Sequence, residues 1–310
     1  MASIFTITGN LLAETTATFN FPKVVGQTVR AISPEKFQSG GKGVNTARIA
    51  KLLGFDAYAG IFPAGYNGKK CVKFIEKYCP TIAVEISGET RTGLVCETPE
   101  GTQTTFLGAD LPVPQSAFVC LLSEFEKSVK PLDIIALCGS FPNWKDSHAK
   151  YLSDFAKEHS LILCADTYGT PLKSLLENSI ELDLLKINRA EMFDFLGVRD
   201  DNSTSLFETT FRKFCKNANA KYIGVSDSQN PAYFYHNDDI FSILPDNLKT
   251  QAFPTGCGDA MFASLICGIF LANYTFKSSA QKATNLATYC ASLQETVPTT
   301  AQKLKEIFKQ

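Results

Sequence analysis

Short apolar runs alternate along the chain with longer segments in which apolar residues recur at helical spacing. The runs predict buried strands at Ile4–Thr8, Ala57–Ile61, Ile134–Leu137, Leu161–Ala165, Leu184–Ile187 and Tyr222–Val225. The helical spacing predicts helices at Val44–Leu53, Gly68–Tyr78, Ser147–His159 and Ser205–Asn217. This alternation predicts an α/β fold, with a mainly parallel sheet covered by helices on both faces. Ligands of such sheets bind beyond the carboxyl ends of the strands.

Two segments, 11–37 and 85–107, do not follow this alternation of strands and helices. They are rich in Thr, Val and Phe, and their residues alternate in polarity. We expect them to form antiparallel strands of a small sheet beside the main one, in a position to cover a site. Residues 109–114 form the expected connector. The chain shows no internal repeat, so residues 1–310 are expected to form a single domain that carries this lid.

The most informative motif for function is Gly256-Cys257-Gly258-Asp259, which lies where a new helical pattern begins. Backbone N–H groups at a helix start lack partners and the helix dipole is positive there, which favours anions. Glycines let an anion come close to that backbone. Asp259 adds a carboxylate at the same place, and a base beside an anion cradle is what phosphoryl transfer to a hydroxyl requires. The alternative is a tight turn with Asp259 as an ordinary helix N-cap.

A second glycine motif, residues 40–45, precedes the first long helical pattern and contains Lys42. It suggests contact with an anion or another polar ligand, and its alternative is a flexible turn. It is not a P-loop, because Lys36 holds the place of the first glycine and Gly43 follows Lys42. A dinucleotide fingerprint would need glycine at Thr46, which argues against an NAD-linked oxidoreductase.

Asn188 and Glu191 follow a predicted buried strand at a spacing of three, so they share one face of a helix. An amide and a carboxylate there can hold water around Mg²⁺. The alternative is that Asn188 caps the helix and Glu191 completes a capping box, and the spacing alone favours this alternative.

Two further positions have both a functional and a structural interpretation. Arg91 lies in the predicted covering sheet, where it could grip a phosphate in a bidentate manner or be an exposed strand cation. Gly139 follows the strand Ile134–Leu137 and could touch substrate or turn the chain. Trp144 and His148, which come next, are expected to pack or to lie at the surface.

Composition narrows the class of protein. The chain has 310 residues, is 45% hydrophobic and carries a net charge of −1 without a basic block, which argues against nucleic acid as a partner. Its ten cysteines form no C-x-x-C pair, so a zinc site is not expected. Cys257 is the one candidate for a reactive thiol, because a helix N-terminus would lower its pKa. No signal-peptide or membrane-spanning pattern is present, so a cytoplasmic location is expected.

Three motifs together resemble the ribokinase-like family of sugar kinases, the PfkB carbohydrate kinases. Ser39–Gly54 is similar to the N-terminal signature of that family and Pro254–Ala263 to its C-terminal signature. Lys186–Glu191 matches its K-P-N-x-x-E motif, with Ile187 in place of proline. The Gly-Gly-Lys-Gly loop and Thr90–Thr92 are most similar to the branch of 1-phosphofructokinase and tagatose-6-phosphate kinase.

The resemblance implies a Rossmann-like sheet with a β lid, ATP as donor and Mg²⁺. It implies that Asp259 is the catalytic base and that Gly256, Cys257 and Gly258 form an anion hole. The implied substrate contacts, of which Lys42 and Arg91 would hold a phosphate on the sugar, are Glu14, Gly41, Lys42, Asn45, Arg91 and Gly139. The implied nucleotide contacts are Lys186, Asn188, Ser226 and Asn285, and Asn188 and Glu191 would hold Mg²⁺ through water.

The expected reaction is transfer of the γ-phosphate of ATP to a hydroxyl of a hexose monophosphate, of the fructose-1-phosphate, tagatose-6-phosphate or fructose-6-phosphate type. Alternatives are a kinase for an unphosphorylated sugar or a nucleoside, and a catalytically weak sugar-binding regulatory protein of the same fold. The resemblance also implies that two copies can pair through the lid. No nucleic acid or membrane partner is expected.

The sequence departs from the family pattern in four places. Glu14 stands where the family usually has aspartate, and Gly93 where the hexose-phosphate branch commonly has asparagine. Phe253-Pro254 replaces an aspartate-threonine pair associated with potassium binding, so potassium activation is not expected. Ser226–Pro231 replaces a glycine-containing segment that flanks the nucleotide in relatives, which leaves the nucleotide preference open.

Overall fold

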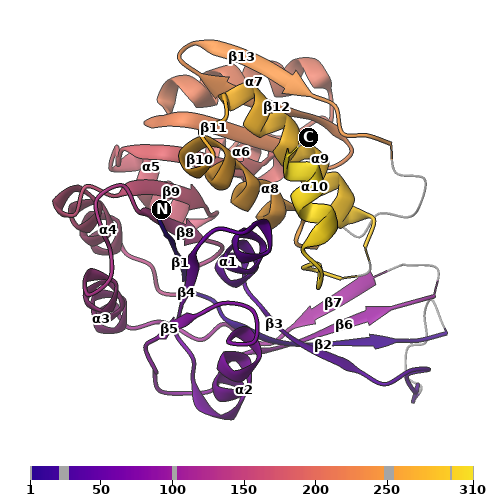
Figure 1. The fold of residues 1–310 in the computed structure, drawn as a ribbon. Coiled ribbons are helices and arrows are strands. Elements are labelled where there is room, and N and C mark those ends of the chain that lie inside the picture. The colour runs from indigo at the N-terminus through magenta and orange to yellow at the C-terminus, as the bar shows by residue number, and fades with distance from the viewer. Residues whose placement is uncertain (1, 21–27, 100–102, 248–254, 294, 310) are drawn as a thin grey trace.

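A computed structural model describes residues 2–20, 28–99, 103–247, 255–293 and 295–309 (Figure 1). Phe253 and Pro254 therefore lie outside the described residues, as do parts of both predicted lid segments.

The main sheet has nine strands in the order β13-β12-β11-β10-β9-β8-β1-β4-β5, and the predicted α/β class is confirmed. Neighbouring strands from β5 to β11 are parallel, while β12 is antiparallel to both β11 and β13. All six predicted strands are present, with ends shifted by a few residues at most. The strands are β1 Ile4–Thr8, β4 Ala57–Ile61, β5 Thr81–Ala83, β8 Ile134–Cys138, β9 Ile162–Asp166, β10 Leu182–Asn188, β11 Ala220–Asp227, β12 Asn230–His236 and β13 Asp239–Ile243.

Helices cover both faces of this sheet, as predicted. One face packs against α3 Gln115–Glu126, α4 Asp146–Glu158, α5 Thr170–Glu177, α6 Arg189–Leu196 and α7 Thr204–Asn217. The other packs against α1 Lys42–Leu53, α2 Gly65–Ile75, α8 Cys257–Ile266, the π-helical turn η1 Cys267–Leu271, α9 Phe276–Ala291 and α10 Gln302–Lys309. No helix in the described part of the chain is long and apolar enough to span a membrane.

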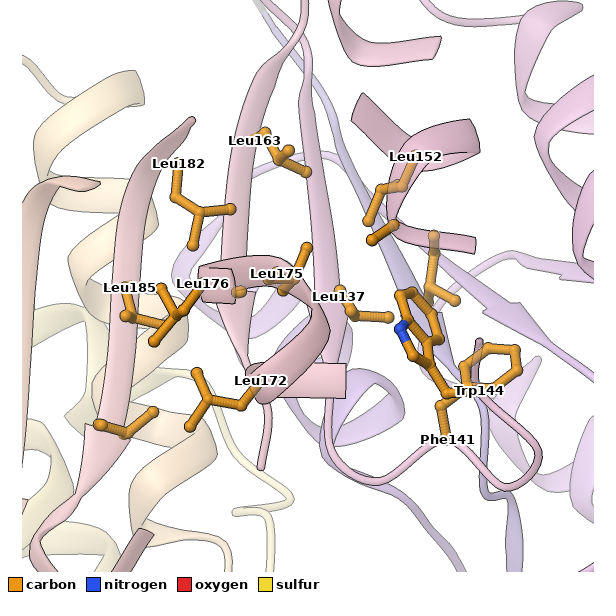
Figure 2. Close-up of a cluster of buried hydrophobic side chains, with 14 of the residues drawn as sticks. Leu137, Phe141, Trp144, Leu152, Leu163, Leu172, Leu175, Leu176, Leu182 and Leu185 are labelled. Carbon is orange, nitrogen blue, oxygen red and sulfur yellow. The ribbon is translucent and has the colours of Figure 1, made fainter. Parts of the chain in front are cut away.

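The core beneath α4 and α5 is built from leucines of three neighbouring strands (Figure 2). Leu137, Leu163 and Leu185 point from β8, β9 and β10 toward the leucines of these two helices. Trp144 stacks on His148, with ring centroids 5.1 Å apart, and both side chains are buried. Of the two places expected for these residues, in the packed interior or at the surface, the structure shows the first.

The order of the strands places a crevice between β1 and β8. From β1 the chain proceeds to β4 and β5 on one side, and later returns to place β8, β9, β10 and β11 on the other. Loops that leave the carboxyl ends of two strands at such a switch diverge, and the space between them is where ligands of open α/β sheets bind. Asn10 follows β1 and Gly139 follows β8, so both lie at this point.

A second sheet of four strands projects from the main body (Figure 1). Its strands, in the order β3-β2-β6-β7, are β2 Leu12–Thr18, β3 Lys36–Gly40, β6 Thr92–Glu97 and β7 Gln103–Leu107. Two neighbouring pairs are antiparallel, but β2 and β6 are parallel, so the antiparallel prediction is wrong for that pair. They belong to separate excursions, after β1 and after β5, and each excursion enters the small sheet from the main body in the same direction. Residues 108–114 form no helix or strand, as predicted for the connector.

Candidate active site

A cleft of about 1070 Å³ lies beyond the carboxyl ends of β1, β8, β10 and β11, beside the first turns of α1 and α8 and against the small sheet. Every predicted site residue lines it except Asn285. The Asn285 side chain instead accepts a hydrogen bond from Gln281, while Thr284 and Thr288 of the same helix line the cleft. Residues four apart share a helix face, and Asn285 lies about 100° around the axis from Thr284.

The start of α8 is open on the cleft side. Its N-cap is Gly256, at φ 85°, and no described side chain caps the helix. Asp259 lies inside the first turn, so its interpretation as an ordinary N-cap is wrong. Its side chain is nevertheless buried, because only 5% of the residue is exposed. A carboxylate therefore stands beside the positive end of a helix dipole.

Asp259 is placed to act as a base near neutral pH. Asn45 Nδ2 donates a hydrogen bond of 2.7 Å to Asp259 Oδ2. Burial, followed by the negative charge of Asp166, raises the pKa of Asp259 from 3.8 to about 7, although Lys42, the Asn45 hydrogen bond and Lys186 oppose the shift. A carboxyl group with such a pKa can take a proton from a hydroxyl and release it to water.

Asp166 was not predicted, and it organises the two lysines of the site. Its Oδ1 accepts from Lys42 Nζ at 2.8 Å, and its Oδ2 accepts from Lys186 Nζ at 3.1 Å. Lys42 also donates to Glu191 Oε1 at 3.1 Å. Burial disfavours the charge on Lys42, but the carboxylates of Asp166, Glu191 and Asp259 outweigh it and raise the pKa of the lysine. Asp166 directly follows the predicted strand Leu161–Ala165, and that position could have revealed it.

Lys186 reaches the start of α8. A Cβ atom added at Gly258 would lie 2.7 Å from Lys186 Nζ, closer than two such atoms can approach. A side chain at position 258 would therefore displace the ammonium group of Lys186 from its present place. Two ammonium groups, from Lys42 and Lys186, thus border the anion-attracting helix end.

Asn188 and Glu191 form the capping box that their spacing favoured. Asn188 accepts from the Glu191 backbone N–H at 2.9 Å, and Glu191 Oε2 accepts from the Asn188 N–H at 2.8 Å. Both residues also line the cleft. In the described part of the chain no three His, Cys, Asp or Glu residues are grouped to bind a metal. The binding of Mg²⁺ through water by Asn188 and Glu191 stays a prediction.

Glu14 lies where the small sheet meets the cleft. It accepts a hydrogen bond from Gln38 Nε2, and the same amide donates to Thr296 Oγ1 at 2.9 Å. Burial raises the pKa of Glu14, although the Gln38 hydrogen bond lowers it. Nearby, Asn45 Oδ1 and Thr8 Oγ1 are buried without a hydrogen-bond partner among the described residues. A buried acceptor left unpaired costs about 1–3 kcal/mol, so both atoms are suited to a ligand that donates hydrogen bonds.

Arg91 is not an exposed cation, since only 13% of its side chain is accessible. Its Nη1 donates to Asp110 Oδ1 at 2.8 Å, at the rim of the cleft. Gly139, at φ 75°, turns the chain after β8 and also lines the cleft. Its N–H donates to the carbonyl oxygen of Asp166 at 2.7 Å. The interpretation of Gly139 as a turn residue is therefore confirmed, and its contact with substrate stays a prediction.

Ser226, which the resemblance predicts to contact the nucleotide, lines the cleft next to an ion network that was not predicted. Arg189 donates to both oxygens of Asp200, at 2.7 Å each, and to Asp227 Oδ2 at 2.9 Å. This network joins the first residue of α6 to the end of β11, and its three side chains lie at the surface of the cleft.

The prediction of a lowered pKa for Cys257 is wrong. Burial, followed by the charge of Asp259, raises the pKa of this thiol to about 12. Desolvation and a neighbouring carboxylate outweigh the helix dipole, so the structure gives no support for a reactive thiol here.

Residues 13–304 match the model of the pfkB family carbohydrate kinases. The chain belongs to this family. The predicted resemblance and the ribokinase-like fold are therefore confirmed. As a carbohydrate kinase, the protein is a phosphotransferase that acts on a hydroxyl group, and kinases of this family use ATP as the phosphoryl donor.

Individual relatives agree with this assignment. A tagatose-6-phosphate kinase of Staphylococcus epidermidis is 26% identical over 291 residues, which cover 91% of each chain. A 1-phosphofructokinase of Bacillus subtilis is 26% identical over 235 residues, which cover 74% of each chain. The crystal structure of phosphofructokinase-2 from Escherichia coli in complex with potassium has a TM-score of 0.88 at 19% identity, and covers 100% of this chain and 99% of that one.

Proposed function

We propose that this carbohydrate kinase transfers the γ-phosphate of ATP to a hydroxyl of a hexose monophosphate. The observation that carries the proposal is the pairing of Asp259 with the uncapped start of α8, at the floor of a cleft that also holds two lysines. The two relatives described above are named tagatose-6-phosphate kinase and 1-phosphofructokinase, and these names support a phosphorylated hexose as the acceptor.

In the proposed mechanism Asp259 accepts the proton of the acceptor hydroxyl as that oxygen attacks the γ-phosphorus. The backbone N–H groups at Gly256, Cys257 and Gly258 stabilise the charge that develops on the transferred group. Lys186, whose ammonium group borders Gly258, adds a positive charge on the same side. The structure supports this assignment by placing all these groups at one end of α8.

The acceptor is proposed to contact Glu14, Gly41, Asn45 and Gly139, while Lys42 and Arg91 face its phosphate. Because two carboxylates already hold Lys42, Arg91 carries the larger share of the phosphate contact in this proposal.

The nucleotide is proposed to contact Lys186, Asn188 and Ser226. The oxygen atoms of Asn188 and Glu191 suit a water-mediated Mg²⁺ ion, because both side chains line the cleft close to the lysines of the phosphate site. When bound, the ion would neutralise charge on the nucleotide phosphates.

We further propose that residues 1–310 act as a single kinase domain with the four-stranded sheet as its lid. The exposed apolar residues Leu94 and Phe106, which are paired across β6 and β7, support association of two copies through this sheet. Sedimentation at micromolar concentration measures that association, and a monomer at all concentrations would contradict it.

The state of the cysteines supports a cytoplasmic location. All ten lie among the described residues, and none of them forms a disulfide.

A screen for ADP release over hexoses, hexose phosphates and nucleosides, with Mg²⁺ and with a chelator, tests the function. We expect turnover with a phosphorylated hexose that stops when the chelator is added. Ligand binding without ADP release over the whole panel would support a regulatory binding protein instead. A preference for unphosphorylated sugars or nucleosides would overturn the acceptor class.

Replacement of Arg91 tests the phosphate contact directly. We expect Arg91→Ala to raise KM for a phosphorylated hexose by about tenfold to a hundredfold, since a charge-assisted hydrogen bond contributes about 1.5–3 kcal/mol. KM for the unphosphorylated parent sugar should change much less. Steady-state kinetics with the two sugars decide the question, and equal effects on both would show that Arg91 does not contact the phosphate.

The pKa of Asp259 predicts the dependence of the reaction on pH. The base must be ionised, and burial and Asp166 hold its proton up to about pH 7. We therefore expect kcat/KM to fall about tenfold per pH unit below that value and to level off above it. In the variant Asp166→Asn this limb should move to lower pH, because a negative neighbour has been removed. A flat profile between pH 5.5 and 8 would exclude Asp259 as the base.

A further inference from the structure

Arg91, which is proposed to bind the phosphate of the acceptor, already has an anionic partner within the chain. Asp110 Oδ1 accepts from Arg91 Nη1 at 2.8 Å and from Asn10 Nδ2 at 2.9 Å. Arg91 and Asn10 both line the cleft. One carboxylate oxygen thus occupies the point on which two donors of the site converge.

We propose that Asp110 is a specificity-determining residue, a built-in competitor that a phosphate on the acceptor must displace from Arg91 and Asn10. The proposal rests on the proposed function, since it assigns to Asp110 a part in recognising the phosphorylated acceptor. It goes further by assigning selectivity to a residue outside the small sheet and outside all three sequence motifs.

The two partners of this ion pair differ in how firmly they are held. The Arg91 side chain is 13% exposed, and its Nη2 reaches the carbonyl oxygen of Asn10 at 3.5 Å. The Asp110 side chain is 55% exposed and belongs to the segment 108–114, which forms no helix or strand. The arginine therefore stays in the cleft wall, while the carboxylate can move into solvent at small cost.

Removal of the carboxylate leaves donors suited to a phosphate. Arg91 Nη1 and Asn10 Nδ2 lose a shared acceptor, while Asn10 keeps its second bond of 2.9 Å to Ser140 Oγ. Arg91 Nε, which is buried without a partner among the described residues, is a further unused donor on the same guanidinium. Guanidinium groups bind phosphate oxygens through two such N–H groups.

The competition has a consequence for substrate choice. An unphosphorylated sugar offers no charge to replace that of Asp110, so the ion pair persists and Arg91 keeps a partner. A phosphorylated sugar supplies a dianion in place of a single carboxylate, and gains from the exchange. Asp110 lowers the apparent affinity for the phosphorylated acceptor, because part of its binding free energy is used to break the existing pair.

The variant Asp110→Asn tests this role, because it keeps the shape and an acceptor oxygen but removes the charge. We expect KM for the phosphorylated hexose to fall threefold to tenfold at unchanged kcat, and KM for the unphosphorylated parent to stay the same. Inorganic phosphate, measured by calorimetry, should also bind several times more tightly. In an Arg91→Ala background the same substitution should have a much smaller effect on both measurements, because only the hydrogen bond from Asn10 to Asp110 is then left to break.

Asp246→Asn is the matched control, since Asp246 is exposed, lines the same cleft and follows the edge strand β13 of the main sheet, whereas Arg91 precedes β6 of the small sheet. An equal fall in KM in this control would show a general charge effect and overturn the proposal, as would an unchanged or raised KM in Asp110→Asn. If the protein acts only on unphosphorylated acceptors, the proposed function fails, and the phosphate calorimetry still decides whether Asp110 competes for Arg91. If phosphorylated acceptors are preferred but Asp110→Asn changes nothing, this inference alone fails.

Discussion

The variant Asp259→Asn is expected to lower kcat by about 10²–10⁴-fold, the usual effect of removing a general base. Asparagine has nearly the same shape, and its amide oxygen can still accept the hydrogen bond that Asn45 donates at 2.7 Å. KM for both substrates should therefore change little. Steady-state kinetics with saturating ATP measure the loss, and turnover within a factor of three of the native enzyme would remove Asp259 from the mechanism.

The stability of the Asp259→Asn variant shows whether its lower kcat reflects lost catalysis or misfolding. The pKa of Asp259 in the folded protein, about 7, lies above its ordinary value of 3.8, so between these values the folded state binds more protons than the unfolded state. The stability of the native protein therefore falls as the pH rises from about 4 through 7, because a buried carboxyl group must ionise. The neutral asparagine avoids this cost. We expect Asp259→Asn to be at least as stable as the native protein at pH 8, as measured by urea unfolding.

The main sheet could be predicted from the sequence because its strands are apolar at successive positions. Only burial on both faces of the sheet explains this pattern. All six predicted strands are found in the main sheet. The parallel pairing of β2 with β6 could not be predicted in this way, since it joins segments about 80 residues apart in separate excursions. Local alternation of polarity identifies a strand but not its partner.

The site was predictable where its chemistry lies in contiguous motifs. The start of α8 and the glycine loop before α1 each place several functional groups within a few residues, and the structure brings both to one cleft. Asp166 and Asp110 are single acidic residues whose roles arise from partners far away in the chain. For Asp166 the only local signal is its place directly after a predicted strand, where ligands of such sheets bind. Asp110, in the connector, has no local pattern that distinguishes it.

Electrostatics were the least predictable feature. The expectation for Cys257 used the helix dipole alone, but burial and the carboxylate of Asp259 two residues away raise the pKa of the thiol. Both effects depend on how closely the surrounding elements pack, which sequence spacing does not reveal. The same two effects, burial and a neighbouring carboxylate, raise the pKa of Asp259 and make it suitable as a base.

The second large effect is expected from Gly256→Ala at the N-cap of α8. Gly256 has φ 85°, a conformation that costs a residue with a side chain about 1–2 kcal/mol. A Cβ atom here would also overlap the backbone carbonyl oxygen of Thr296, which is not the end of a flexible side chain. The first turn of α8 must therefore shift away from the α9–α10 loop, and the N–H groups proposed to face the transferred phosphate shift with it.

We expect kcat of Gly256→Ala to fall by about 10²-fold or more, since loss of one well-placed donor costs about 10²–10³-fold and a displacement of about 1 Å has a similar effect. Gly197→Ala is the matched control. Gly197 caps the end of α6 at φ 61°, and a Cβ atom there would meet nothing within 4 Å. It therefore isolates the backbone strain, about 1–2 kcal/mol of unfolding free energy, with kcat unchanged. If the two variants lose equal stability and both keep native turnover, the geometry of the α8 start does not limit catalysis, and the anion-hole assignment must be abandoned.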